Sequence, residues 1–139
     1  MNTFDARAVH PVVPLIGRVL LAILFVVSGY GKLTHYAATE GYMAAAGLPL
    51  IGVLLPLTIL CELGGGLLLM LGLFTRPIAV LLFLFTIPVT LAFHHFWDVP
   101  AAQAVMQQTN FLKNLSIMGG LLLLASYGAG AYSVDARRR

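Results

Sequence analysis

The stretch LPLTILCELGGGLLLMLGLFTR, residues 55–76, is almost entirely apolar, yet it carries a glutamate, Glu62, near its middle. Roughly 20 apolar residues make one helical membrane crossing, so this stretch is long enough to span a bilayer. An ionisable side chain at mid-bilayer costs at least ~2.5 to 3.5 kcal/mol on insertion scales, and it therefore usually faces the interior of a helical bundle. The position of Glu62 predicts either a polar partner for it or a functional role.

The composition of the whole chain indicates an integral membrane protein. Of its 139 residues 60% are hydrophobic and only 9% are charged, and the mean hydropathy is +0.94. A soluble domain of this size rarely has so little polar surface. The net charge of +3 comes from basic residues near the ends of apolar segments, and only residues 137–139 form a basic run. This distribution is typical of membrane topology and argues against nucleic-acid binding.

The apolar residues fall into four segments, so we predict an all-α fold, a single-domain four-helix membrane bundle over residues 1–139. The segments lie at about 13–33, 48–73, 77–96 and 111–127. Pro77 suits the first turn of the third helix, whereas Pro56 and Pro88 lie inside helices and predict kinks. Residues 35–47 are too polar to cross and are expected to form a loop or short helix at the membrane surface.

The cations predict the orientation of the bundle. If both termini lie on one side, the arginines lie towards that side and the lysines towards the other. Because cytoplasmic ends are enriched in basic residues, the arginine-rich side, with both termini, is predicted to be cytoplasmic. The first segment contains Arg18 and lacks a small-x-small cleavage site, so it is expected to be retained as a span and not removed as a signal peptide.

Several polar residues lie in or near the outward half of the predicted spans, and two interpretations of them stay open. In the structural interpretation, Glu62 is protonated or paired, and Arg18 and Lys32 anchor helix ends; Arg18 can reach the head groups or bend towards Glu62. In the functional interpretation, Glu62 belongs to a polar pocket where a ligand binds and a proton moves. Glu62 is then the candidate catalytic residue, and the candidate ligand-binding residues are Lys113, His94, His95, Asn110, Asn114, Lys32 and Arg18.

Metal, haem and thiol chemistry find little support in the sequence. His94 and His95 are adjacent, so on a helix their side chains point about 100° apart and do not converge on one metal. Cys61 is the single cysteine, which excludes a dithiol relay within one chain. We therefore predict no metal site. A proton relay or a contact with the head group of a bound ligand is the favoured functional role for one histidine, because imidazole titrates near neutral pH; the alternative is that both lie at a solvated span end.

The glycines of the second segment have an architectural interpretation. Gly64, Gly65 and Gly66 lie directly after Glu62, and Gly119 and Gly120 lie in the fourth segment. Small residues allow helices to approach closely in lipid. The run lacks the Lys and Ser or Thr of a phosphate-binding loop, so nucleotide binding is not expected.

The stretches GRVLLAILFVVSGYGKL (17–33), CELGGGLLLMLGLFTRPIAVLL (61–82) and NFLKNLSIMGGLLLL (110–124) resemble the DoxX family of bacterial inner-membrane proteins. The resemblance covers nearly the whole chain. Two patterns carry it, R…F…G…K in the first span and E…GG…L…G…TR in the second. Their positions here are Arg18, Phe25, Gly29, Lys32, Glu62, Gly65, Gly66, Leu69, Gly72, Thr75 and Arg76.

This resemblance implies a multi-pass inner-membrane protein connected with redox metabolism, in a family that includes a subunit of thiosulfate-to-quinone electron transfer. The chain has no flavin or Fe–S motif, so the implied role is to bind a quinone or similar lipid-like ligand around Glu62 beside a separate redox partner, with no intrinsic cofactor. The alternative is a non-enzymatic scaffold for a soluble partner or a homo-oligomer. A small transporter is disfavoured because four spans without inverted repeats leave little room for alternating access.

Overall fold

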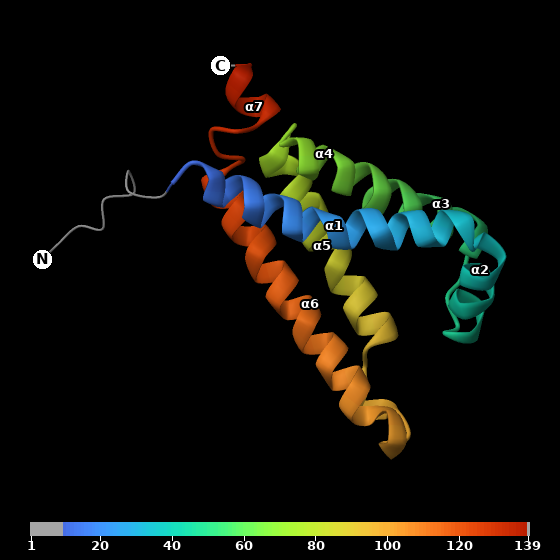
Figure 1. Cartoon of the computed structure of the whole chain (residues 1–139). Coiled ribbons are helices and arrows are strands. Elements are labelled where there is room, and N and C mark those ends of the chain that lie inside the picture. The colour runs from blue at the N-terminus through green and yellow to red at the C-terminus, as the bar shows by residue number, and fades with distance from the viewer. Residues whose placement is uncertain (1–9, 139) are drawn as a thin grey trace, which may run out of the picture.

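The computed structural model describes residues 10–138, and all regular elements within that range are helical (Figure 1). The predicted all-α class is thus confirmed. The helices are α1 (Val12–Thr34), α2 (Tyr36–Ala45), α3 (Ile51–Ile59), α4 (Gly65–Leu71), α5 (Thr75–Phe93), α6 (Ala101–Tyr127) and α7 (Val134–Arg137), with a π-helical turn η2 (Leu60–Gly64) between α3 and α4 and a 3-10 turn η3 (Phe96–Asp98) after α5.

Three helical segments are long and apolar enough to cross a membrane. They are Val12–Thr34, Ile51–Leu71 and Thr75–Asp98, and they correspond to the first three predicted spans. The second is one continuous rod made of α3, η2 and α4, with Pro56 inside it. Helix α6 is long enough, with 27 residues, but its first half is rich in amides, so it is not apolar enough to count among these three.

The start of the fourth helix differs from the sequence-based expectation. Helix α6 begins at Ala101, directly after Pro100, whereas the sequence placed the start of the fourth segment near residue 111. The polar residues 101–110 had the composition of a loop, but proline before the first helical residue is compatible with a helix start. The segment 35–47, expected to be a loop or a short helix, contains α2.

The helices form two pairs that meet at one end and diverge at the other (Figure 1). Helix α1 packs along the α3–η2–α4 rod, and α5 packs along α6. We call the end with α7 and the start of α1 the closed end, and the end with α2 and η3 the open end. Most of the buried apolar core lies where the two pairs meet, formed by Ala22, Phe25, Leu69, Ala79, Leu82 and Leu121.

Two glycines allow α1 and the second rod to touch backbone to backbone. A Cβ added to Gly29 would lie 2.5 Å from the backbone nitrogen of Leu63, and one added to Gly66 would lie 3.0 Å from that of Val26. Neither backbone can yield to a side chain. The close approach brings the face of α1 that carries Ser28 and Lys32 against η2, and so fixes the surroundings of Glu62.

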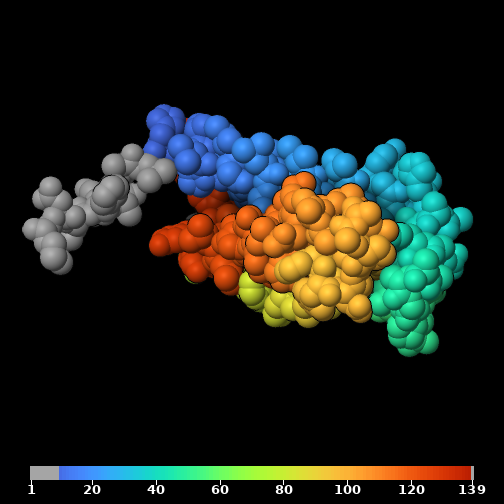
Figure 2. Space-filling view, turned by 90° about the horizontal axis from the view of Figure 1, so that it is seen from below, coloured from blue at the N-terminus to red at the C-terminus, as the bar shows by residue number. Residues whose placement is uncertain are grey.

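The outer surface is apolar in a way that suits lipid. Leu20, Leu60 and Leu123 are 66%, 67% and 62% exposed. Soluble monomers rarely expose contiguous apolar surface on this scale, so these faces fit the hydrocarbon of a bilayer. Figure 2 views the bundle from below, with α2 at the end opposite the start of α1. The ring of Tyr42 on α2 stacks on that of Phe93 on α5, with centroids 5.1 Å apart.

Candidate functional site

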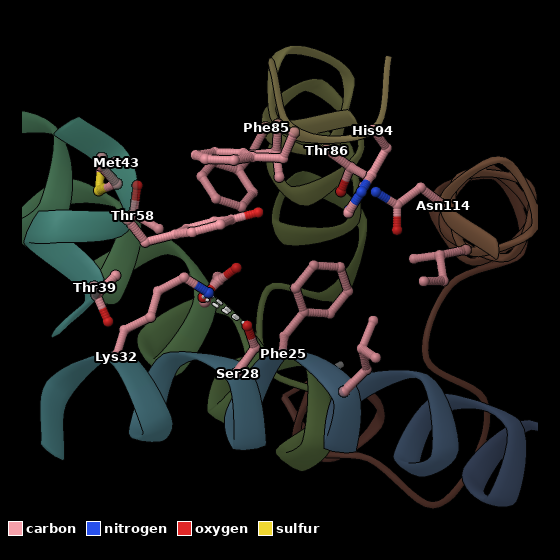
Figure 3. Close-up of a pocket in the computed structure, with 16 residues that line it drawn as sticks. Phe25, Ser28, Lys32, Thr39, Met43, Thr58, Phe85, Thr86, His94 and Asn114 are labelled. Carbon is pink, nitrogen blue, oxygen red and sulfur yellow. Dashed lines mark hydrogen bonds and ion pairs between the residues drawn. The ribbon is translucent and has the colours of Figure 1, made fainter. Parts of the chain in front are cut away.

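A cavity of about 270 Å³ lies in the wedge between the two helix pairs. Its lining comes from α1, α2, the α3–η2–α4 rod, α5 and α6, so every long helix contributes to it. Figure 3 shows polar side chains on two opposing walls with aromatic rings between them. The residues used below are Phe25, Ser28, Lys32, Tyr42, Glu62, Phe85, Thr86, Phe93, His94 and Asn114.

The first polar wall is an ion pair between α1 and η2. The Lys32 ammonium lies 2.7 Å from Oε2 of Glu62 and donates to the Ser28 hydroxyl at 2.6 Å. Ser28 in turn donates to the same Glu62 oxygen at 3.1 Å. The Glu62 side chain is 7% exposed and that of Lys32 27%, so the carboxylate is buried and the ammonium reaches the cavity more openly.

This arrangement follows from local sequence. Ser28 and Lys32 are four residues apart on α1, so they lie on the same helix face. Glu62 lies in a π-helical turn, a distortion that is frequent at functional sites because it changes the direction of side chains within a helix. Burial of a paired carboxylate in a bundle satisfies its charge, but the pair leaves hydrogen-bonding capacity unused. All hydrogen bonds to Glu62 from described residues reach Oε2, and none reaches Oε1.

The second polar wall is built on α5 and α6. Asn114 donates to the Thr90 hydroxyl at 2.9 Å, and Thr90 donates to the backbone oxygen of Thr86 at 2.7 Å. His94 Nδ1 lies 2.8 Å from Oε1 of Gln107, which can only accept. This contact ties the end of α5 to α6.

The remaining wall is apolar and aromatic. Phe25 from α1 and Phe85 from α5 face the cavity from its two sides (Figure 3). The stacked rings of Tyr42 and Phe93 join α2 to α5 at the open end. Polar groups on two walls with flat apolar surface between them suit a ring-shaped ligand that carries polar atoms at its edge.

Four of the sequence-predicted site residues line this cavity together: Lys32, Glu62, His94 and Asn114. The other four, Lys113, Asn110, His95 and Arg18, do not line it. Lys113 is exposed because it lies next to the inward-facing Asn114, about 100° around the helix. Asn110 lies one turn further towards the open end, and the His95 ring packs near Trp97, with centroids 6.3 Å apart.

Arg18 lies at the closed end, and the expectation that it reaches the head groups or bends towards Glu62 is wrong. Its guanidinium donates to the backbone oxygens of Met70 at 3.4 Å, of Ala129 and of Tyr132 at 2.8 Å. The side chain is only 2% exposed. Residues 128–138 fold over the helix ends to supply two of these oxygens, and we call this segment together with Arg18 and Gly72 the C-terminal clasp.

Asp135 fastens the clasp to the start of α5. Its two carboxylate oxygens accept from the backbone nitrogens of Phe74 and Thr75, each at 2.8 Å, and its own nitrogen donates to Gly72 at 2.9 Å. Burial raises the pKa of the carboxyl, but these hydrogen bonds and the charge of Arg138 outweigh that effect and hold the pKa below its ordinary value. Gly72 has φ +69°, and an added Cβ would lie 2.5 Å from that of Ser133.

Comparison with known proteins identifies the family. The family model described as DoxX matches residues 13–95. The chain belongs to the DoxX family. It is 38% identical over 140 residues to the inner membrane protein YphA of Escherichia coli (strain K12), an alignment that covers 99% of this chain and 100% of the relative.

A second relative agrees. The chain is 46% identical over 121 residues to the inner membrane protein YqjF of the same organism, across 87% of this chain and 88% of the relative. With its three span-capable helices, this member of the DoxX family is a multi-pass protein of the bacterial inner membrane. No solved structure matches the chain.

The residues that carry the DoxX resemblance divide between the two ends of the bundle. Phe25, Lys32 and Glu62 line the cavity, whereas Arg18 and Gly72 belong to the clasp. Gly29 and Gly66 lie between them and allow the close approach of the helices. The family pattern thus describes both a polar cavity and the structure that closes the opposite end.

Sequence reasoning missed part of the DoxX-family cavity. Ser28 was detectable, because it lies four residues before Lys32 on the same helical face. Thr86, Thr90 and His94 are also spaced by four residues and form a polar stripe on α5. The aromatic lining had no comparable signal, since aromatic residues occur throughout the apolar segments. Within residues 10–138, no group of three or more His, Cys, Asp or Glu side chains is placed to hold a metal ion.

Proposed function

We propose that this chain is a four-span membrane subunit of a redox system, with both termini cytoplasmic, that binds a quinone or a similar lipid-like ligand in the cavity beside Glu62. A separate protein partner would supply the redox centre. The observation that carries the proposal is the Lys32–Glu62 pair on the wall of a cavity that also has polar groups on its opposite wall.

Helix α6 supplies the fourth crossing in this proposal. Its 27 residues extend for about 40 Å at 1.5 Å per residue, which exceeds the hydrocarbon thickness of a bilayer. It packs along α5, and its polar residues Asn114 and Gln107 turn inward to Thr90 and His94. The arginines at the closed end favour a cytoplasmic position for that end.

The hydrogen-bonding capacity left on the two walls supports a ligand with two acceptor groups. Lys32 has three N–H donors, of which Ser28 and Glu62 take two. Asn114 uses one amide N–H for Thr90 and retains another. The carbonyl oxygens of a quinone accept such bonds, and its ring fits between Phe25 and Phe85. A volume of about 270 Å³ suits a head group, so an isoprenoid tail would extend into lipid.

Glu62 is the proposed proton carrier. Reduction of a quinone to a quinol takes up two electrons and two protons; the electrons would come from the partner. Lys32 can donate one of these protons to a bound carbonyl, and Glu62, held against it at 2.7 Å, can accept and pass on the proton that replaces it. The second proton would reach the other carbonyl from water at the open end of the cavity.

The experiment is lipid analysis of the protein purified in a mild detergent. Mass spectrometry is expected to detect a quinone with the wild type and much less with Glu62→Gln or Lys32→Met. Glu40→Gln is the matched control, because Glu40 is exposed on α2 and does not line the cavity. Retention of the same quinone by Glu62→Gln would refute the site, provided that circular dichroism shows equal helicity.

The alternative function is a non-enzymatic scaffold for a soluble partner or a homo-oligomer. Gly52 and Gly119 favour it, since an added Cβ meets nothing within 4 Å at either position, and exposed small residues allow another helix to approach closely. Cross-linking followed by native mass spectrometry separates the two functions. A scaffold would be recovered with a defined partner or a second copy and with an empty cavity.

A further inference from the structure

The closed end carries two further hollows that meet at the same two residues. One is a polar hollow of about 300 Å³ between Arg76 and the loop 128–133. The other is an apolar groove of about 420 Å³ between α1 and α6. Tyr127 and Gly128 line both, so the two hollows adjoin and share one wall. Neither contains residues of the Glu62 cavity.

The guanidinium of Arg76 differs from that of Arg18 because it has no hydrogen-bond or ion-pair partner among residues 10–138. Arg18 is saturated by backbone oxygens, whereas Arg76 makes no hydrogen bond or ion pair with any residue between 10 and 138. Its guanidinium lies over Gly128, with Nε 3.3 Å from where a Cβ would be. A side chain there would push the guanidinium away, so the glycine keeps the cation against the loop.

The loop adds backbone donors to the same hollow. The backbone nitrogens of Ala129, Gly130 and Ala131 donate to no other described residue. Asp135 also lines the hollow, but both of its oxygens are engaged by the start of α5. Arg137 and Arg138 are exposed on the same end, so the local charge is positive. A guanidinium with free backbone N–H groups beside it suits a phosphate group.

The groove is shaped for a hydrocarbon chain. Leu21, Leu123 and Leu124 line it, and Gly17 and Gly120 leave space between the two helices. An added Cβ at Gly17 would meet nothing within 4 Å. Leu123 and Tyr127 are 62% and 82% exposed, so the groove opens on the outer surface of the bundle, where lipid lies.

We propose that the closed end holds one anionic phospholipid, with its phosphate at Arg76 and the loop 128–133 and one acyl chain in the groove between α1 and α6. The positive charge at the closed end and the direct connection of the polar hollow with the apolar groove favour this occupant. A soluble anion would use only the polar hollow, and a second copy of the chain would bring its own arginines towards Arg76. One phospholipid can occupy both hollows at once, with its phosphate at the level of the membrane head groups. The proposal does not depend on the ligand of the Glu62 cavity.

The experiment measures lipid enrichment around the full chain. The protein is reconstituted in nanodiscs with equal amounts of phosphatidylglycerol and phosphatidylcholine, released, and analysed by native mass spectrometry. Phosphatidylglycerol is expected to remain bound to the wild type. Arg76→Gln should reduce its retention about tenfold or more, as for the loss of one charge-assisted hydrogen bond. Arg137→Gln removes the same charge from the same end but lies outside the hollow, and it should retain the lipid.

A second pair of variants tests the groove. Gly17→Leu fills it without a clash at Cβ and should release the bound phosphatidylglycerol; Gly119→Leu, equally open but outside the groove, should not. Equal losses in Arg76→Gln and Arg137→Gln would overturn the proposal, because they indicate diffuse charge attraction. Displacement of the lipid by millimolar inorganic phosphate, or a dimer that Gly17→Leu abolishes with lipid retention unchanged, would overturn it as well.

Discussion

Arg18 and Lys32 lie on the same helix, α1, about 21 Å apart along its axis, and they are stabilised in different ways. Arg18 is 2% exposed and donates to backbone oxygens of three residues, which cannot change charge or move away. Lys32 is 27% exposed and is paired with a carboxylate that can take up a proton, at the edge of a cavity. A cation held by backbone oxygens serves architecture, whereas a cation held by a titratable side chain can exchange partners.

The largest effect should come from breaking the closed end. Arg18→Leu leaves the oxygens of Ala129 and Tyr132 without their donor, and we expect a loss of about 3 kcal/mol or more in the free energy of unfolding. Unfolding in mixed detergent micelles, followed by circular dichroism, measures it. Arg137→Leu removes an exposed cation from the same end and should change stability by less than about 0.5 kcal/mol. Similar losses in the two variants would show that Arg18 is no structural anchor.

An intermediate effect is expected at the open end. Lys32→Met leaves Glu62 unpaired, and because the ammonium is partly exposed we expect a loss of about 2 kcal/mol, less than for a fully buried pair. The double variant Lys32→Met/Glu62→Gln should lose less free energy of unfolding than the two single variants lose together, since it removes both charges. The same unfolding assay measures the cycle. Strict additivity would mean that the pair contributes no coupling.

The smallest effect concerns Asp135 and is pH-dependent. Its folded pKa lies below the unfolded value of about 3.9. Its stabilisation is therefore fully present above that unfolded value and is lost as the pH falls through the folded pKa. Asp135→Asn weakens the cap on α5 and should cost about 1 kcal/mol at neutral pH. The difference in melting temperature between wild type and variant should shrink below about pH 4.

The control for this prediction lies at the open end. Asp98 is exposed, and its side chain makes no hydrogen bond or ion pair with any residue in the described part of the chain. Asp98→Asn should match the wild type at neutral pH. A pH-independent difference between Asp135→Asn and wild type would contradict the charged capping role of Asp135.

Much of the fold could be predicted because lipid imposes a simple pattern on the chain. The first three apolar segments coincide with helices to within a few residues. Glu62, expected to face the interior of the bundle, is buried there and paired with Lys32. The start of α6 could not be read, because its first turns mix amides with alanine and single apolar residues and carry no continuous apolar run. The exposure of Lys113 could not be predicted either, because the sequence does not show which face of α6 turns towards the bundle.

The partners of the charged side chains were the least predictable part of the site. Lys32 and Glu62 are 30 residues apart in sequence, and their contact depends on the close approach at Gly29 and Gly66. Arg18 binds backbone oxygens, which every residue has, so no sequence pattern identifies Ala129 or Tyr132 as its acceptors. A pattern can show that a charge must be satisfied, but only the packing of the helices shows by which group.

The distance in sequence between Arg18 and its acceptors also sets an order of assembly. Two of the acceptors lie 111 and 114 residues after it. At ordinary translation rates the ribosome needs on the order of 10 s to make that length of chain. For this interval the nascent protein must shelter an arginine near the start of its first span without its final acceptors, and insertion machinery or lipid phosphates have to stand in for them. The contacts of Arg18 with Ala129 and Tyr132 can therefore form only after the helices between them have been made.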